Sequence, residues 1–138
     1  MGEIVKQVAV EAPAQEVYQY VVDPRNAPQF ISSINSILSG PEGTPKKGDV
    51  WKAEATFFGQ RRLLNLRLDD LVVGRAVRFV LDGEPQAVLV LKLTHDGDPR
   101  RTTVSLTLDV SGVPSILLNG LLGNLLSADM VRLKSNLE

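Results

Sequence analysis

Residues 102–137 read TTVSLTLDVSGVPSILLNGLLGNLLSADMVRLKSNL, and this stretch decides the fold. Every second residue from Val104 to Val110 is apolar, which predicts a strand with one apolar and one polar face. Leucines then recur at intervals of three, four and seven residues between Pro114 and Leu137, and they predict one helix of about 24 residues. A sheet with an apolar face has to be covered, and this helix is the element large and apolar enough to cover it.

The preceding segments predict the rest of an antiparallel sheet. Alternating residues between glycine and proline turns mark strands over residues 3–10, 32–39, 50–58, 62–71, 77–82, 86–94 and 102–110. Residues 86–94 are apolar on both faces over much of their length, so we expect this strand in the middle of the sheet.

Two short helices are expected between the first two strands. One begins with Pro13 at its first helical position and ends at Asp23-Pro24, and the other covers residues 27–31. The predicted fold is therefore α+β: a curved antiparallel sheet of about seven strands wraps around a long C-terminal helix, with a groove between them. Residues 1–138 form a single domain in this prediction.

Composition excludes several classes of protein. Leucine, valine, isoleucine and phenylalanine make up one third of the chain, which excludes intrinsic disorder. Zero cysteines exclude disulfide scaffolds and thiolate sites, and a single histidine excludes any site that needs two imidazoles. The net charge of −1 argues against nucleic-acid binding, and no apolar run is long enough to span a membrane. We expect a cytoplasmic protein without a metal or cofactor.

Residues that usually perform catalysis are scarce. His95 beside Asp96 suggests a general base, but the pair begins a turn, and a solvated histidine is the favoured interpretation. Asp69 and Asp70 are adjacent on a strand, so their side chains diverge and do not share a proton or a metal. The alternation also directs the charged residues of the strands outward: Glu54, Arg67, Asp69, Arg78 and Asp109. We therefore predict no catalytic residues.

Several short motifs occur together in a recognisable order. They are the run Pro13-Ala14-x-x-Val17-Tyr18-x-x-Val21-x-Asp23-Pro24, then Phe30, Gly40, Gly48, Thr103-Val104, and Leu133-Lys134-x-x-Leu137-Glu138. In order and spacing the chain resembles the START-like superfamily, over its whole length. Bacterial single-domain members of that superfamily are called polyketide cyclase/dehydrase or coenzyme-Q-binding-like proteins.

This resemblance implies a helix-grip fold with an internal hydrophobic cavity for a lipid, quinone or polyketide. Two departures from the family pattern are visible. The family commonly has tryptophan where Phe30 stands, and no aromatase or cyclase catalytic set maps onto this chain.

The candidate ligand-binding residues lie on the inner strand face and the covering helix. They are Phe30, Trp51, Ala53, Ala55, Phe57, Leu66, Phe79, Leu91, Leu106, Leu118, Asn119 and Leu122. Small residues occur on both sides of this interface, including Gly120 and Gly123 on the helix. They either bring two backbones together or leave space for a bound molecule.

Three functions fit the sequence. The first is a carrier or sequestering protein for a hydrophobic small molecule. The second is an enzyme of the cyclase, dehydratase or aromatase type acting in the same cavity, and the third uses the apolar face of residues 117–126 to bind a protein or a membrane. The scarcity of catalytic residue types favours the first.

Overall fold

The computed structural model describes residues 2–57, 59–83, 86–95, 97–114, 116, 119–120 and 122–138. Its main feature is a seven-stranded antiparallel sheet in the order β1-β7-β6-β5-β4-β3-β2. The strands are β1 (Gly2–Val10), β2 (Ile34–Ser39), β3 (Val50–Phe57), β4 (Gln60–Val72), β5 (Ala76–Asp82), β6 (Ala87–Thr94) and β7 (Thr102–Val110).

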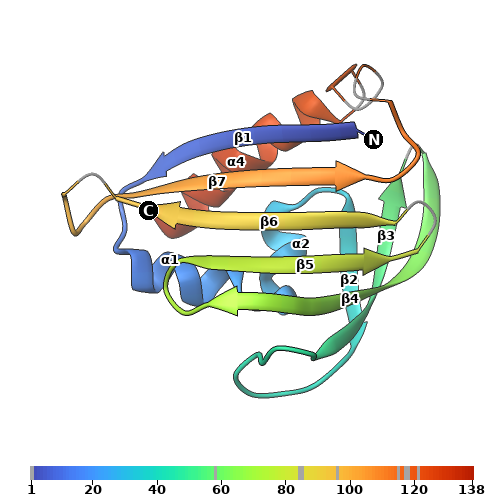
Figure 1. Ribbon diagram of the computed structural model, residues 1–138, viewed down its shortest axis with the longest axis horizontal. Coiled ribbons are helices and arrows are strands. Elements are labelled where there is room, and N and C mark those ends of the chain that lie inside the picture. The colour runs from blue at the N-terminus through green and yellow to red at the C-terminus, as the bar shows by residue number, and fades with distance from the viewer. Residues whose placement is uncertain are drawn as a thin grey trace.

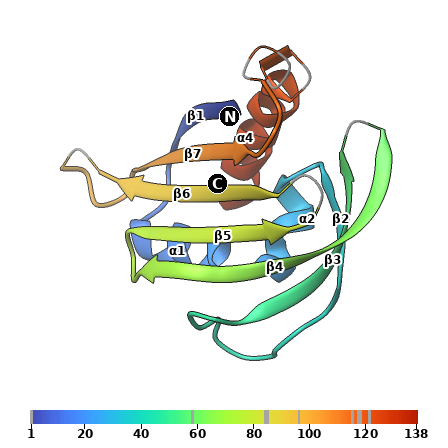
Figure 2. The ribbon, with the colours of Figure 1, turned by 45° about the vertical axis from the view of Figure 1, so that its right-hand side comes forward.

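The helices lie on one side of this sheet. They are α1 (Ala14–Val21), the single 3-10 turn η1 (Pro24–Asn26), α2 (Ala27–Phe30) and α4 (Gly123–Leu137). Figure 1 shows α4 behind β1 and β7, with α1 and α2 behind the lower strands. Figure 2 shows how β4, β3 and β2 curl around the same side, so that the sheet encloses the helices on its concave face. The expected α+β helix-grip architecture is confirmed.

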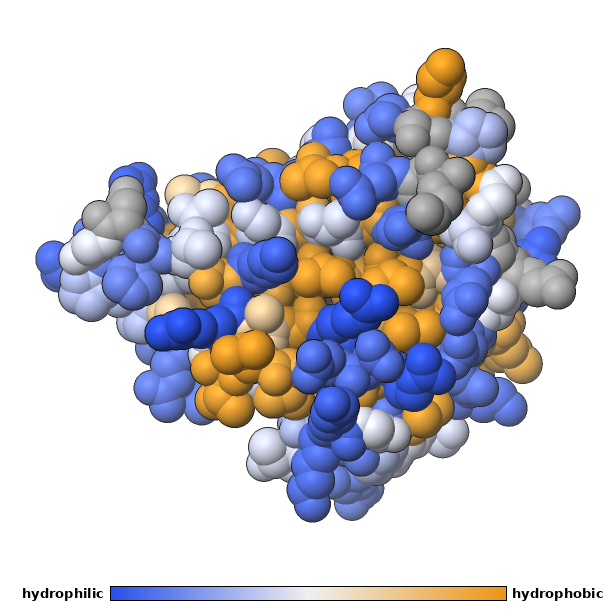
Figure 3. Space-filling view, in the orientation of Figure 1, coloured by the Kyte–Doolittle hydropathy of each residue, from blue (hydrophilic) through white to orange (hydrophobic). Residues whose placement is uncertain are grey.

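The strand faces follow the alternation in the sequence. On β3, Trp51, Ala53 and Ala55 are fully buried, whereas Lys52 between them is exposed. β6 lies between β5 and β7, and its outward Val88 is half-buried, as expected for a central strand. The space-filling view of the outer face shows apolar side chains along the middle of the sheet, with hydrophilic ones around and partly over them (Figure 3).

The segment between β1 and β2 forms as predicted, with a shift of one residue at its start. Pro13 is the N-cap of α1 in an extended conformation, not its first helical residue. Asp23 ends this helical segment and its carboxylate accepts a hydrogen bond from the Arg25 backbone N–H at 3.0 Å, which begins η1. These caps fix the direction in which α2 crosses the concave face.

The predicted beginning of the C-terminal helix is wrong. α4 begins at Gly123, and Leu122 before it lies in a turn, so the helix has 15 residues and does not run from Pro114. Glycine inside a helix costs about 1 kcal/mol relative to alanine, and the sequence places Gly120 and Gly123 in succession. The chain therefore breaks where the predicted helix would have been weakest. Among the residues that the structure describes, no helix is long and apolar enough to cross a membrane.

Candidate functional site

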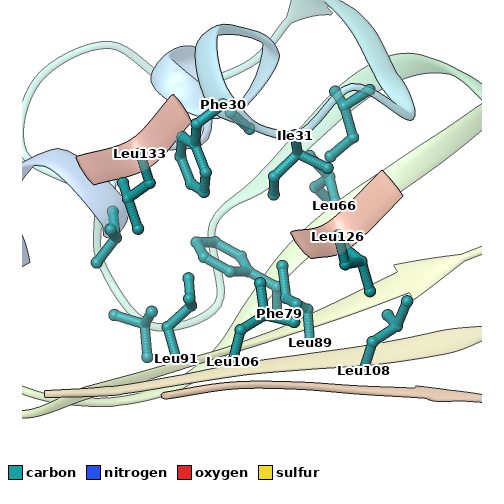
Figure 4. Packing of buried hydrophobic residues seen from close by; sticks show 14 of the residues in the cluster. Phe30, Ile31, Leu66, Phe79, Leu89, Leu91, Leu106, Leu108, Leu126 and Leu133 are labelled. Carbon is teal, nitrogen blue, oxygen red and sulfur yellow. The ribbon is translucent and has the colours of Figure 1, made fainter. Parts of the chain in front are cut away.

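The concave face of the sheet and the helices enclose an apolar interior. Figure 4 shows Phe30 and Ile31 facing Phe79 and the leucines of β6 and β7, with Leu126 and Leu133 of α4 on either side. Two small spaces lie within this packing. The first space is lined by Val21, Pro24, Ala27, Phe30, Ile31, Ile34, Leu66, Phe79, Leu89 and Leu91. The second space is lined by Ile31, Ser33, Ile34, Phe57, Leu81, Leu89, Leu106, Leu108, Leu122 and Leu126.

Both spaces are nearly filled by side chains. The volume open to the centre of a water molecule is about 10 Å³ in the first space and about 30 Å³ in the second. Pockets that hold a drug-sized ligand measure about 300–1,000 Å³. Ile31, Ile34 and Leu89 line both spaces, so the two spaces belong to one continuous apolar region.

Most of the residues proposed from the sequence converge on this region. Those that line the first space are Phe30, Leu66, Phe79 and Leu91, and those that line the second are Phe57, Leu106 and Leu122. Trp51, Ala53 and Ala55 belong to the same buried cluster but line neither space. Asn119 is exposed and lies outside the cluster, and Leu118 is not among the described residues.

Trp51 has a structural role at the edge of this cluster. Its indole Nε1–H donates to the carbonyl of Pro41 at 3.3 Å. A Cβ added at Gly40 would overlap the indole ring, so the close approach of the 40–49 loop to Trp51 requires glycine there. The indole is thus held between β3 and this loop.

The glycines of the C-terminal segment do not bring backbones together. A Cβ at Gly120 would meet no described atom within 4 Å, and one at Gly123 would approach only the Lys6 ammonium at 4.0 Å. Gly120 is also exposed. These glycines flank the turn at Leu122 that precedes α4, and neither is among the described residues that line the two interior spaces.

The polar groups considered from the sequence lie outside the interior. His95 is exposed at the end of β6, and Asp96 is not among the described residues. Asp69 pairs with Arg78 at 3.1 Å and with Arg67 at 3.7 Å, whereas Asp70 lies 3.7 Å from Lys47. Within the described part of the chain, no three histidine, aspartate or glutamate side chains converge to hold a metal ion.

Asp129 on α4 is the buried carboxyl that sequence reasoning missed. It is only 1% exposed, and its Oδ2 accepts a hydrogen bond from the Ser32 backbone N–H at 3.2 Å. Burial raises the pKa of Asp129, and hydrogen bonding from Ser32 and the positive charge of Arg132 offset part of that rise. The sequence contains one indication of this burial. Asp129 stands three residues after Leu126 and four before Leu133, and this spacing places it on the apolar face of the helix.

A wide groove lies outside the interior, on the other side of α1 and η1. Its walls come from α1 and η1, the 43–45 segment and the β4–β5 turn, and its volume open to water is about 910 Å³. The lining residues are Ala14, Gln15, Tyr18, Gln19, Val22, Asp23, Arg25, Gly43, Thr44, Pro45, Leu71, Val73 and Gly74. We call it the outer groove. Val21 and Pro24 line the first space, whereas Val22 and Asp23 line the outer groove, so this single segment separates the two.

Arg25 holds that segment to the 40–49 loop. Its guanidinium makes two hydrogen bonds to the Asp23 carboxylate, at 2.8 and 2.9 Å, and donates a third to the carbonyl of Gly43 at 2.8 Å. The bond to Gly43 joins η1 to the 40–49 loop, and Arg25 and Gly43 both line the outer groove.

Comparison with known proteins agrees with this architecture. The model of the family described as polyketide cyclase / dehydrase and lipid transport matches residues 1–138. No curated protein matches the sequence at a significant level.

Several solved structures share the fold. A START superfamily protein from Mycobacterium smegmatis has a TM-score of 0.79 at 20% identity and covers 99% of this chain and 97% of that chain. The Zhui aromatase/cyclase from Streptomyces sp. R1128 has a TM-score of 0.74 at 17% identity, with 97% and 92% covered. A protein from Chromobacterium violaceum has a TM-score of 0.73 at 18% identity, with 100% and 99% covered. These likenesses confirm the START-like fold expected from the motifs, and the match over residues 1–138 shows that the chain belongs to the polyketide cyclase/dehydrase and lipid transport family.

Proposed function

We propose that the protein binds a hydrophobic small molecule between the sheet and α4, as a carrier or sequestering protein. The observation that carries this proposal is the continuous apolar lining of the two interior spaces, in which Ser33 is the one polar residue among the described residues that line them. Family membership supports a role in binding hydrophobic ligands, with lipid, quinone and polyketide-like molecules as the classes to test.

Binding requires the interior to open, because the closed spaces are far smaller than such a ligand. The energy for opening comes from contacts that the ligand then makes with the separated apolar walls. Side-chain rotation of Phe30 and Phe79, which face each other across the first space, is the smallest movement that would enlarge it (Figure 4).

Gently purified protein should therefore retain or take up such a molecule. Native mass spectrometry would detect a co-purified ligand, and thermal-shift measurements with fatty acids, quinones and aromatic polyketides would identify the preferred class. A bound ligand at a hundred times its Kd stabilises the fold by about 2.7 kcal/mol, which is measurable as a rise in Tm.

A matched pair of variants on β6 tests the location. Leu89 lines both spaces, whereas its neighbour Val88 points to the outer face of the sheet. We expect Leu89→Phe to reduce ligand binding at least tenfold, because it fills the space that the ligand needs, and Val88→Phe to leave binding unchanged. Equal binding by both variants would show that the ligand lies elsewhere.

The second candidate is an enzyme of the cyclase or dehydratase type, acting in the same cavity. The observation in its favour is Asp129, an ionisable group buried at the α2–α4 junction, together with the fold shared with an aromatase/cyclase. Incubation with linear polyketide-like substrates, followed by mass spectrometry and product separation, distinguishes the two. A carrier returns the ligand unchanged, whereas an enzyme returns a cyclised or dehydrated product.

A further inference from the structure

The outer groove has room for a ligand in the closed structure, whereas the interior does not. Its volume open to water is about 910 Å³, within the range of about 300–1,000 Å³ that is usual for pockets that hold small molecules. The two interior spaces have about 10 and 30 Å³. A molecule can therefore lie in the outer groove without any separation of the sheet from α4.

One wall of the outer groove is a stripe of side chains along α1 and its C-cap. Ala14, Tyr18 and Val22 follow one another at intervals of four residues, so they lie on one face of the helix, and all three line the groove. A second wall comes from Leu71 and Val73 beside the β4–β5 turn, and Figures 1 and 2 both show α1 next to this turn. Apolar side chains on both walls favour a ligand with an apolar body.

Tyr18 presents an unpaired hydroxyl to this groove. The residue lines the groove and is only 8% exposed, but its hydroxyl makes no hydrogen bond to any residue that the structure describes. The oxygen is not sealed inside the protein either, because the one fully buried side-chain oxygen without a partner in the described part of the chain is Asp129 Oδ1. The ring of Tyr18 is therefore held by packing while its hydroxyl stays available to water or to a ligand.

The charged groups of the groove favour a neutral ligand. Asp23 and Arg25 both line it and pair with each other through two hydrogen bonds, at 2.8 and 2.9 Å. The negative charge of Glu42 also acts on Arg25, so an anion placed here would meet two carboxylates for one guanidinium. Burial raises the pKa of Tyr18, which keeps its hydroxyl protonated and able to donate at neutral pH.

We propose that the outer groove is a second binding site, for a neutral and largely apolar molecule whose carbonyl oxygen accepts a hydrogen bond from the Tyr18 hydroxyl. Aromatic ketones and esters fit this description, because they combine an apolar body with a single fixed acceptor. Hydrocarbons of the same shape and anionic analogues are disfavoured. The site does not depend on the proposed function, since the groove exists without any opening of the interior.

Benzophenone and diphenylmethane make a matched pair of probes for the full-length chain. Both consist of two phenyl rings, which are joined by a carbonyl in benzophenone and by a CH₂ group in diphenylmethane. On irradiation, the benzophenone carbonyl takes a hydrogen from a C–H group that it touches, and its carbon then bonds to the protein. Peptide mass spectrometry of the labelled chain locates that bond. We expect label within residues 14–22 and 71–74, and label on interior residues alone would overturn the inference.

Tyr18→Phe is the decisive variant, because it removes the hydroxyl and keeps the ring. We expect the unmutated protein to bind benzophenone about three- to tenfold more tightly than diphenylmethane, which is the effect of one neutral hydrogen bond, and Tyr18→Phe to bind the two alike. Tyr20→Phe is the matched control and should keep the preference, because the Tyr20 hydroxyl already donates to Gln29 at 2.8 Å. Equilibrium dialysis gives the dissociation constants.

Leu89→Phe separates this site from the interior, because Leu89 lines both interior spaces and does not line the outer groove. The labelling of the groove and the preference for benzophenone should persist in this variant. Equal affinities for the two probes in the unmutated protein, or a preference that Tyr18→Phe keeps, would overturn the inference and leave the proposed function standing. Label in the groove of a protein whose interior takes up no ligand would support the inference while the proposed function fails.

Discussion

At the scale of single residues, the burial of Asp129 has a consequence for stability. Its pKa is raised in the folded protein, so the folded state holds the proton more tightly than the unfolded state does. The stability that this provides is complete below the ordinary Asp pKa of 3.8 and is lost as the pH rises through the folded-state value. At neutral pH the ionised carboxylate therefore gives a lower free energy of unfolding than the protonated carboxyl would.

Asp129→Asn should remove that cost while keeping the acceptor for the Ser32 N–H. We expect the free energy of unfolding at pH 7 to rise by about 1 kcal/mol, with the gain shrinking as the pH falls towards 3. Urea unfolding of both proteins across this range measures it. A variant that is less stable at neutral pH would show that the carboxylate is well paired in solution, and a difference that does not change with pH would show that folding leaves the pKa of Asp129 unchanged.

The sequence predicted the inward strand residues better than the helix residues. On β3 the alternation placed Trp51, Ala53 and Ala55 inward, and they are fully buried. Asp129 was missed because one polar residue on an apolar helix face looks like an interruption. Its partner Ser32 lies 97 residues away in the sequence, and no local pattern shows that contact.

At the scale of elements, the main difference is where the C-terminal helix begins. The leucine spacing continues across residues 117–126, so periodicity alone predicted one helix. The structure ends that continuity at Leu122 because nothing compensates for the glycines: Gly120 is exposed and has no described neighbour that requires a bare backbone. Hydrophobic spacing predicts which face of a helix is buried, but the position where the helix breaks depends on the free energy that glycine costs in a helix.

Gly120→Ala tests this explanation. Residue 120 is helical and a Cβ there would meet no described atom within 4 Å, so alanine should raise the free energy of unfolding by about 0.5–1 kcal/mol. Gly74→Ala is the contrasting variant, because Gly74 also has open space but a φ of +77°. It should destabilise by about 1 kcal/mol. Thermal and urea unfolding measure both, and a destabilised Gly120→Ala would mean that Gly120 is needed for a close contact.

At the scale of the whole molecule, the sequence was enough to predict the sheet but not the state of its interior. Regular turns and consistent alternation predict that strands next to each other in the sequence also pair in the sheet. The observed order agrees for β2 to β7, and β1 pairs with β7 at the edge. Whether small residues leave a cavity depends on how all the side-chain volumes fit together. Ala53 and Ala55 were candidate ligand-binding residues, yet they line neither interior space, and both spaces lie beside Ile31 and Leu89.

A closed interior makes a prediction about kinetics. If the walls must separate before a ligand enters, the observed binding rate should level off at high ligand concentration, at the rate of opening. The segment of α1 and η1 between the outer groove and the first space is the natural place for this movement, because one layer of chain separates the two. Trp51, the single tryptophan, reports on it because its indole contacts the adjoining 40–49 loop.

Arg25→Gln should raise that limiting rate. The substitution removes the hydrogen bond from Arg25 to the Gly43 carbonyl, so the 40–49 loop separates from η1 more easily. The Arg25 side chain is partly exposed, so solvent weakens its contacts, and we expect a modest increase of about two- to fivefold. Stopped-flow fluorescence of Trp51 measures the rate, with the fatty acid or polyketide that gives the largest thermal shift as the ligand. Arg61→Gln, which removes an exposed pair with Glu54 on the far side of the sheet, should leave it unchanged. A rate that rises linearly with ligand concentration in all three proteins would instead mean that the interior is open often enough for diffusion to limit binding.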